Sequence, residues 1–160
     1  MTGIAIRAAE ERDLAELDAA LAALSREIGD PYHAGVDALA RALFGVPPST
    51  WAHVAARRDG IGGAVLFAPV FSTVRGGAGA FVSDLWVDSA ERGNGLGGAL
   101  LHAAAETAGA LWSARFMRLS VHDNNTRADT FYRNLGFEPV TGETVMVLKG
   151  QAFQNMRRSS

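Results

Sequence analysis

Directly after Arg92, four of six consecutive residues are glycines, and Gly93 is the first of them. A glycine has no side chain to keep a ligand away from the backbone, so its amide can approach an anion closely. The apolar periodicity from Leu96 onward predicts that the cluster opens a helix, whose first amides lack partners and carry the positive end of the helix dipole. The spacing therefore predicts a phosphate-binding loop formed by Arg92, Gly93, Asn94, Gly95, Leu96, Gly97 and Gly98.

Three other interpretations of these glycines have to be weighed. Gly93, Gly95 and Gly98 satisfy the G-x-G-x-x-G pattern of dinucleotide-binding folds, but that pattern normally follows the first strand of its domain, and here a polar link and about 80 residues come before it. A P-loop is not indicated because no Gly-Lys-Ser/Thr is present. A turn that only permits tight packing of a strand against a helix is the structural alternative.

A second motif lies about thirty residues further on and ends at a glycine that can close a helix. Residues 82–98 and this motif together resemble the GNAT family of N-acetyltransferases, in particular the diamine and polyamine enzymes and the aminoglycoside 3-N type. The family's cofactor pattern, Arg/Gln-x-x-Gly-x-Gly/Ala, is matched by Arg92, Gly95 and Gly97. The resemblance covers residues 4–149, and the second motif consists of Asn125, Ala128, Phe131, Tyr132, Gly136 and Phe137.

The resemblance implies acetyl-CoA as cofactor, with its diphosphate held by the glycine loop. It also implies that the strand ending in Leu85, Trp86 and Val87 binds the pantetheine arm, and that Asn125 lies near the thiol end. A strand amide near Leu85 or Trp86 would face the developing oxyanion. Tyr132 would be the general acid that protonates the leaving sulfur, and a purely structural core aromatic is the alternative.

The general base is where the sequence departs from polyamine-type relatives. Those relatives carry a glutamate at the position before Asp84, whereas this chain has Ser83. A serine hydroxyl cannot accept the amine's proton at neutral pH. Asp84 could do so if burial raises its pKa, and a structural hydrogen-bond acceptor or a water-mediated route stays open.

Acceptor binding is predicted in the segment between the first two helices and beside Ser83. Glu27 and Asp30 could pair with a substrate ammonium, and Tyr32 could face it through a cation–π contact. Ordinary surface charge is the alternative for both acids.

These residues require a frame that holds a strand, the glycine loop and two helices together. The apolar periods predict an α/β (α+β) fold with a mixed, twisted central sheet of about six or seven strands and helices on both faces. The resemblance implies that this fold is of the GNAT type. One domain is expected over residues 1–150, followed by a frayed tail over residues 151–160. The expected strands are residues 4–7, 50–57, 62–71, 81–87, 116–121 and 144–149, and the expected helices are residues 14–28, 36–44, 95–109 and 125–135.

Composition excludes several other classes of protein. The 160 residues include no cysteine, and the four histidines lack metal-ligand spacing, so no metal is expected. A net charge of -2 gives no case for nucleic-acid binding. No apolar run approaches the roughly 20 residues of a membrane helix, so we expect a cytoplasmic protein without membrane partners. A homodimer formed through the sheet edge or the tail stays open, and no residue of the sequence identifies the interface.

The predicted function is N-acetylation of a primary amine of a small molecule, with direct attack on acetyl-CoA in a ternary complex. The acceptor could be a diamine or polyamine, an amino acid or an aminoglycoside-like amine. Acetylation of a protein lysine or N-terminus is the enzymatic alternative. An acyl-CoA-binding module without catalysis is the other alternative, motivated by Ser83.

Overall fold

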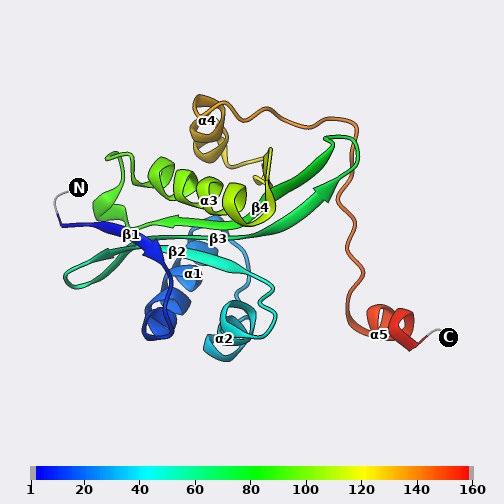
Figure 1. Cartoon of the computed structure of the whole chain (residues 1–160), viewed down its shortest axis with the longest axis horizontal. Coiled ribbons are helices and arrows are strands. Elements are labelled where there is room, and N and C mark those ends of the chain that lie inside the picture. Colours follow the sequence, from blue (N-terminus) through cyan, green and yellow to red (C-terminus); the bar gives the residue numbers. More distant parts are fainter. Residues whose placement is uncertain (1–2, 159–160) are drawn as a thin grey trace. The chain divides into compact units, whose positions relative to one another are not determined.

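The computed structural model describes residues 3–158, which form two compact units that divide between Asn125 and Thr126 (Figure 1). The first unit contains one mixed sheet in the order β1-β2-β3-β4-β5, in which only the β4–β5 pair is parallel. Within residues 3–158 five strands form, fewer than the six or seven expected. The elements of this unit are β1 (Ala5–Ala8), η1 (Glu11–Asp13), α1 (Leu14–Ile28), α2 (Val36–Phe44), β2 (Trp51–Arg57), β3 (Gly60–Ser72), β4 (Gly77–Val87), η2 (Ser89–Glu91), α3 (Leu96–Trp112) and β5 (Met117–Leu119).

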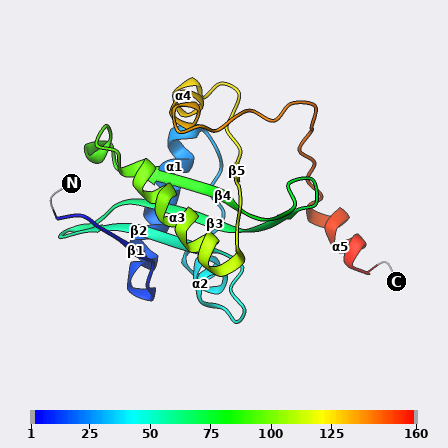
Figure 2. The same ribbon diagram turned by 45° about the horizontal axis from the view of Figure 1, so that its top comes forward.

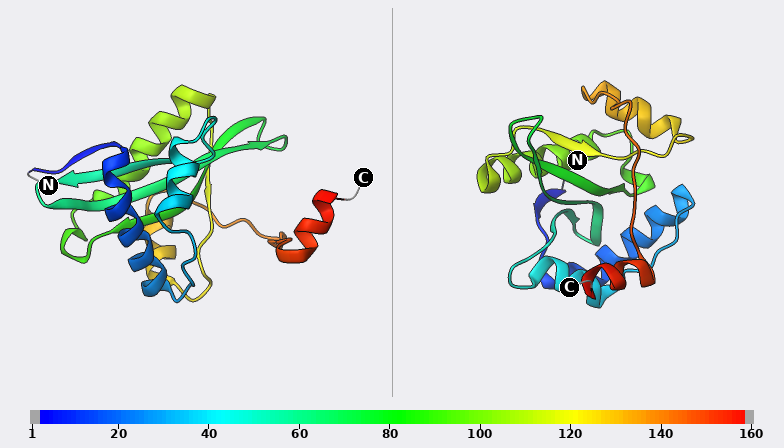
Figure 3. Two further views of the ribbon diagram at one scale, coloured as in Figure 1. Left: turned by 90° about the horizontal axis from the view of Figure 1, so that it is seen from below. Right: turned by 90° about the vertical axis from the view of Figure 1, so that its right-hand side faces the viewer.

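Helices cover both faces of this sheet, as expected from the sequence. Helix α3 lies on one face, and α1 and α2 lie on the other (Figures 1 and 3). On the α1 side, Leu17, Leu21 and Leu39 pack with strand residues such as Leu66 in one buried cluster. Apolar side chains spaced at helical and strand periods thus meet on both faces of the sheet and hold the helices against it.

The α3 face depends on close approach of the helix to β3. A Cβ built on Gly63 would lie 2.9 Å from Leu100 Cδ1 and 3.0 Å from the Trp86 carbonyl oxygen, so no larger residue fits without a shift. Leu96 and Leu100 are buried there. The first turn of α3 is therefore held against the sheet at the end of β4.

Strand β4 is irregular at one residue. Its register with β3 shifts so that Leu66 faces Asp84 and Phe67 faces Val82, which leaves Ser83 as the extra residue of a β-bulge. On its other side, β4 pairs with β5 only from Ala80 to Val82 (Figure 2). The half of β4 after the bulge therefore pairs on one side only.

The second unit contains two helices, α4 (Thr126–Asn134) and α5 (Gly150–Arg158). Gly136 has φ 98°, and the Phe137 amide donates to the Tyr132 carbonyl at 3.0 Å, so α4 ends as the sequence predicted.

Two predictions for this unit were wrong. Residues 144–149 form no strand within the described chain, because β-branched composition suits a pleated surface but cannot replace a hydrogen-bonding neighbour. The expected frayed tail is helical over Gly150–Arg158, which contains Gln, Ala, Met and Arg, residues that favour helix, and residues 159–160 lie outside the described chain. The extent of one domain over residues 1–150 stays a prediction.

Candidate active site

The glycine cluster forms the turn that leads into α3. Gly93 has φ 83° and Gly95 has φ 79°, a left-handed backbone that side chains rarely adopt. The first bond of the helix runs from the Ala99 amide to the Gly95 carbonyl at 3.1 Å. The amides of Leu96, Gly97 and Gly98 precede it and so have no intrahelical acceptor. Amides without an intrahelical acceptor at the start of a 17-residue helix are suited to an anion.

Ion pairs hold the link between β4 and this loop. Arg57, the last residue of β2, reaches Asp88 at 2.7 Å and Glu91 at 3.0 Å. The hydrogen bond from Arg57 keeps the pKa of Asp88 below its usual range. Asp88 also accepts from the Ala90 amide at 3.2 Å. The entry to the loop is therefore fixed by side chains of the sheet and of η2.

Arg92, predicted to contact the cofactor, is occupied by partners in its own chain. Its Nε donates to the Val87 carbonyl at 3.0 Å, and its Nη2 donates to Glu27 Oε2 at 2.6 Å. The contact joins residues 65 positions apart in the sequence, so no local pattern around either residue predicts it. The guanidinium ties the loop to β4 and to the last turn of α1.

The second half of β4 offers a backbone edge. The Asp88 amide donates to the Gly62 carbonyl at 2.9 Å, so by strand alternation the amides of Asp84 and Trp86 also face β3. The amides of Leu85 and Val87 point to the opposite side, where β5 does not pair. Val87's carbonyl takes the Arg92 bond. Leu85 thus presents its N–H and C=O toward the gap between β4 and β5.

The side chains of Asp84 and Trp86 lie on the α1 face of the sheet, since they oppose Leu66 and Ala64 of the core on that side. Burial raises the pKa of Asp84, and a hydrogen bond from Ser83 opposes this. Trp86 Nε1 is buried and has no hydrogen-bond partner among the described residues. A carboxyl group with raised basicity and a spare N–H therefore share this face.

Tyr32 lies on the same face and packs against the core cluster. Its hydroxyl donates to Asp18 Oδ1 at 2.6 Å. Burial, together with Asp18 and the more distant charge of Asp84, raises the pKa of Tyr32 to about 12. The structure thus brings Tyr32 and Asp84 to one region; Asp18 was not singled out by its sequence, where it is one of several acids on α1.

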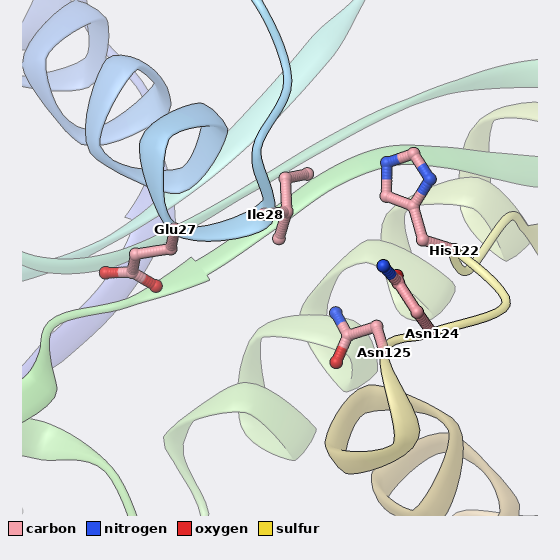
Figure 4. A pocket seen from close by; sticks show the side chains of 5 residues that line it. All are labelled: Glu27, Ile28, His122, Asn124 and Asn125. Carbon is pink, nitrogen blue, oxygen red and sulfur yellow. The ribbon is translucent and has the colours of Figure 1, made fainter.

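Glu27 and Asp30, which the sequence offers as partners for a substrate ammonium, both have partners within the chain. Glu27 pairs with Arg92, and Asp30 Oδ2 lies 2.9 Å from His122 Nε2. A pocket of about 250 Å³ lies between the end of α1 and the segment after β5 (Figure 4). It is lined by Glu27, Ile28, His122, Asn124 and Asn125.

Asn125 is the last residue of the first unit, and its backbone N–H donates to the His122 carbonyl oxygen at 2.9 Å. Tyr132 belongs to the second unit, where its ring makes edge contacts with Phe131 at 5.1 Å and with Phe137 at 5.4 Å between centroids. Burial raises the pKa of Tyr132, so its hydroxyl keeps its proton at neutral pH. It can therefore act as a donor.

Comparison with known proteins decides the family. A family model described as the acetyltransferase (GNAT) family matches residues 17–137. The chain belongs to the GNAT acetyltransferase family. Its members are acetyl-CoA-dependent N-acetyltransferases, so this GNAT protein is an enzyme of the acyltransferase class. No match is found among curated proteins.

Solved structures agree with the GNAT fold. An integron cassette protein from the mobile metagenome of V. cholerae is 18% identical with a TM-score of 0.77, over 99% of this chain and 100% of that one. The ribosomal-protein-alanine N-acetyltransferase of Brucella melitensis biovar Abortus 2308 is 20% identical with a TM-score of 0.72, over 90% and 99%. An aminoglycoside acetyltransferase from an uncultured soil metagenomic sample is 18% identical with a TM-score of 0.73, over 92% and 97%. At these identities the likeness establishes the fold.

Two further observations concern residues 3–158 alone. No group of three or more His, Asp or Glu side chains there could hold a metal ion. No helix in that range is both long enough and apolar enough to cross a membrane.

Proposed function

We propose that this GNAT enzyme transfers the acetyl group of acetyl-CoA to the primary amine of a small molecule, by direct attack in a ternary complex. The observation that carries the proposal is the half of β4 that pairs on one side only and continues, through the short link with η2, into the glycine loop. Backbone donors in these two places suit the two polar parts of coenzyme A, the diphosphate and the amide-bearing pantetheine arm. The bound cofactor would supply an acetyl group activated as a thioester.

The loop and strand would divide the binding of coenzyme A between them. The amides of residues 93–98 would hold the diphosphate, with Arg92 fixing the loop and contributing its own backbone. Leu85 and Val87 would border the pantetheine arm along the β4 edge, and Asn125 would lie near its thiol end. Trp86 would contribute through its side chain on the α1 face, because its amide faces β3.

Leu85 is the best placed donor for the negative charge that develops on the carbonyl oxygen. Its N–H faces the gap, whereas the N–H of Trp86 is directed to β3. An amide fixed in a strand needs no reorganisation to stabilise that charge, and one such donor can contribute roughly 3 kcal/mol. The sequence left Leu85 and Trp86 as equals, and strand alternation favours Leu85.

Asp84 would take the proton of the attacking amine. Its burial raises its pKa and makes it a stronger base than an exposed aspartate. Ser83, which donates a hydrogen bond to it, would orient the carboxylate. Tyr132 would deliver its proton to the departing thiolate sulfur as the carbon–sulfur bond breaks, and would regain a proton from solvent.

The charges favour a monoamine over an extended polyamine. Glu27 and Asp30 are both paired within the chain, to Arg92 and His122, and Asp18 accepts the Tyr32 hydroxyl, which leaves Asp84 on this face to meet an ammonium. Tyr32 would contact the acceptor and Asp18 would fix its hydroxyl. We therefore place the acceptor on the α1 face of the sheet, beside Tyr32.

The chain has two tyrosines, which allows a matched experiment. Tyr132→Phe is expected to lower kcat about 10- to 100-fold, the range of a lost general acid, with the Kd of CoA unchanged. Tyr32→Phe is the control and should raise KM for the amine while leaving kcat within about threefold. The assay measures thiol release from acetyl-CoA with a panel of small amines and peptides, and mass spectrometry identifies the product. Equal kcat for wild type and Tyr132→Phe would remove Tyr132 from the mechanism, and acetylation of peptides alone would replace the small-molecule acceptor by a protein.

A further inference from the structure

The last turn of α1 and the segment just after it are joined to the residues that follow both strands bordering the gap. Glu27 reaches Arg92, which comes after β4, and Asp30 reaches His122, which comes after β5. Figure 4 shows Glu27 on this turn and His122 on the segment after β5. The Glu27–Arg92 contact is the shorter, at 2.6 Å against 2.9 Å.

Glu27 stands where local helix energetics disfavour a carboxylate. The end of a helix carries a partial negative charge, so acids in the last turn cost free energy and bases gain it. Glu27 is the second-last residue of α1. Arg92 neutralises it from outside the helix, and this tertiary contact is what makes an acid at this position favourable.

Arg92 in turn uses its guanidinium to fix the start of the glycine loop. One nitrogen holds the Val87 carbonyl at the end of β4, and another holds Glu27. Gly93 follows at once, and its left-handed backbone sets the path of the amides after it. The orientation of Arg92 is therefore transmitted to the loop through a single peptide link.

We propose that Glu27 is a positioning residue for the cofactor loop, acting through Arg92, and does not bind the acceptor amine. The inference rests on the proposed binding of coenzyme A to this loop. It assigns to Glu27 a role on the cofactor side, although its helix lies on the acceptor face of the sheet.

The effect of Glu27 on CoA affinity distinguishes this proposal from a role in which Arg92 contacts a phosphate directly. If Arg92 served mainly as a phosphate ligand, Glu27 would compete for it, and removing the charge of Glu27 would tighten CoA binding. If Glu27 positions the loop through Arg92, the same change weakens binding. The sign of one measurement therefore distinguishes the two roles.

The test compares Glu27→Gln with Glu106→Gln, an exposed acid of α3 that gives the same change of charge. Calorimetry with CoA should show a two- to fivefold larger Kd for Glu27→Gln, the range of a partly exposed ion pair, and no change for Glu106→Gln. KM for acetyl-CoA should rise by the same factor, while kcat and KM for the amine stay within 1.5-fold of wild type.

A double variant tests whether Glu27 acts through Arg92. Arg92→Gln should weaken CoA binding more than Glu27→Gln, since it also loses the Val87 contact, and adding Glu27→Gln to it should change Kd by less than 1.5-fold. Tighter or unchanged CoA binding in Glu27→Gln, or a rise confined to KM for the amine, would overturn the proposal while wild-type binding of CoA upheld the function. No heat from wild type with CoA would reject both.

Discussion

The two halves of β4 have the same backbone and very different surroundings. Before the bulge, Ala80–Val82 hydrogen-bonds β3 on one side and β5 on the other. After it, residues 84–87 pair with β3 alone and lead to the glycine loop. One half completes the sheet, and the other leaves a backbone edge for a ligand. Together with the proposed function, the contrast predicts that stability and catalysis depend on different halves of one strand.

The bulge explains how the change occurs within one residue. Ser83 is the unpaired extra residue, so the strand bends there and the side chains on either side of it change register. Asp84 thereby comes to the α1 face and Val82 stays opposite Phe67. A substitution before the bulge should affect folding, and one after it should affect catalysis.

Leu85→Pro should give the largest effect on turnover. The Leu85 amide faces the gap, so proline removes this donor without breaking a bond to β3, and a strand edge tolerates it. We expect kcat to fall about 10²- to 10³-fold, with the Kd of CoA within fivefold of wild type, because the loop amides are intact. Leu85→Val keeps the amide and is the control. A kcat within threefold of wild type would show that the open half supplies no such donor.

Asp84→Asn should give the next largest effect, a kcat about 10²-fold lower, typical of a lost general base. Since burial raises the pKa of Asp84, the wild-type rate should fall as pH drops through that raised value, and the variant's profile should lack this acidic limb. An acidic limb that persists in Asp84→Asn would make Asp84 structural.

The raised pKa of Asp84 also predicts how Asp84→Asn changes the stability of the fold. A carboxyl whose pKa is higher in the folded than in the unfolded protein stabilises the fold below the unfolded value, near 3.9, and this contribution disappears as pH rises through the folded value. Asn does not ionise, so urea unfolding at pH 7 should find Asp84→Asn at least as stable as wild type. At pH 4 the two proteins should be closer.

Gly79→Ala should have the smallest effect on catalysis and act on the other half of β4. A Cβ there would lie 2.5 Å from Cε2 and Cζ of Phe116, so the ring must move. We expect a loss of about 1–3 kcal/mol in the free energy of unfolding, as in other overpacked sites, with kcat and KM unchanged. Gly109→Ala is the control: it meets no atom within 4 Å and lies in α3, so stability should rise. A change in KM for acetyl-CoA in Gly79→Ala would mean that the halves are not separable.

Local patterns predicted most of the fold. The period of Leu14, Leu17 and Leu21 gave a helix that the structure begins at Leu14 and ends at Ile28. Helix α2 has the predicted bounds, and the glycine cluster does open α3. Such elements can be predicted because their apolar faces are spaced at the period of the element itself.

The missed features depend on pairing partners distant in the chain. The polar pair Ser83-Asp84 was visible in the sequence, but a bulge is a matter of register with β3. Residues 144–149 have the composition of a strand and no neighbouring strand in the described chain. Glu27 was predicted to pair with the acceptor amine, because nothing in the sequence relates it to Arg92. In the candidate site, the assigned roles stay predictions, and the partners of these side chains, such as Arg92 for Glu27, could not be predicted from spacing.

The ion pairs of Arg57 have a consequence for the kinetics of binding. They hold the segment between β4 and the glycine loop before any ligand arrives. Little chain has to be ordered on association, so no slow closing step need precede capture. The association rate constant would then depend on diffusion and on ionic strength. Differences in affinity among variants of this loop would appear in the dissociation rate constant.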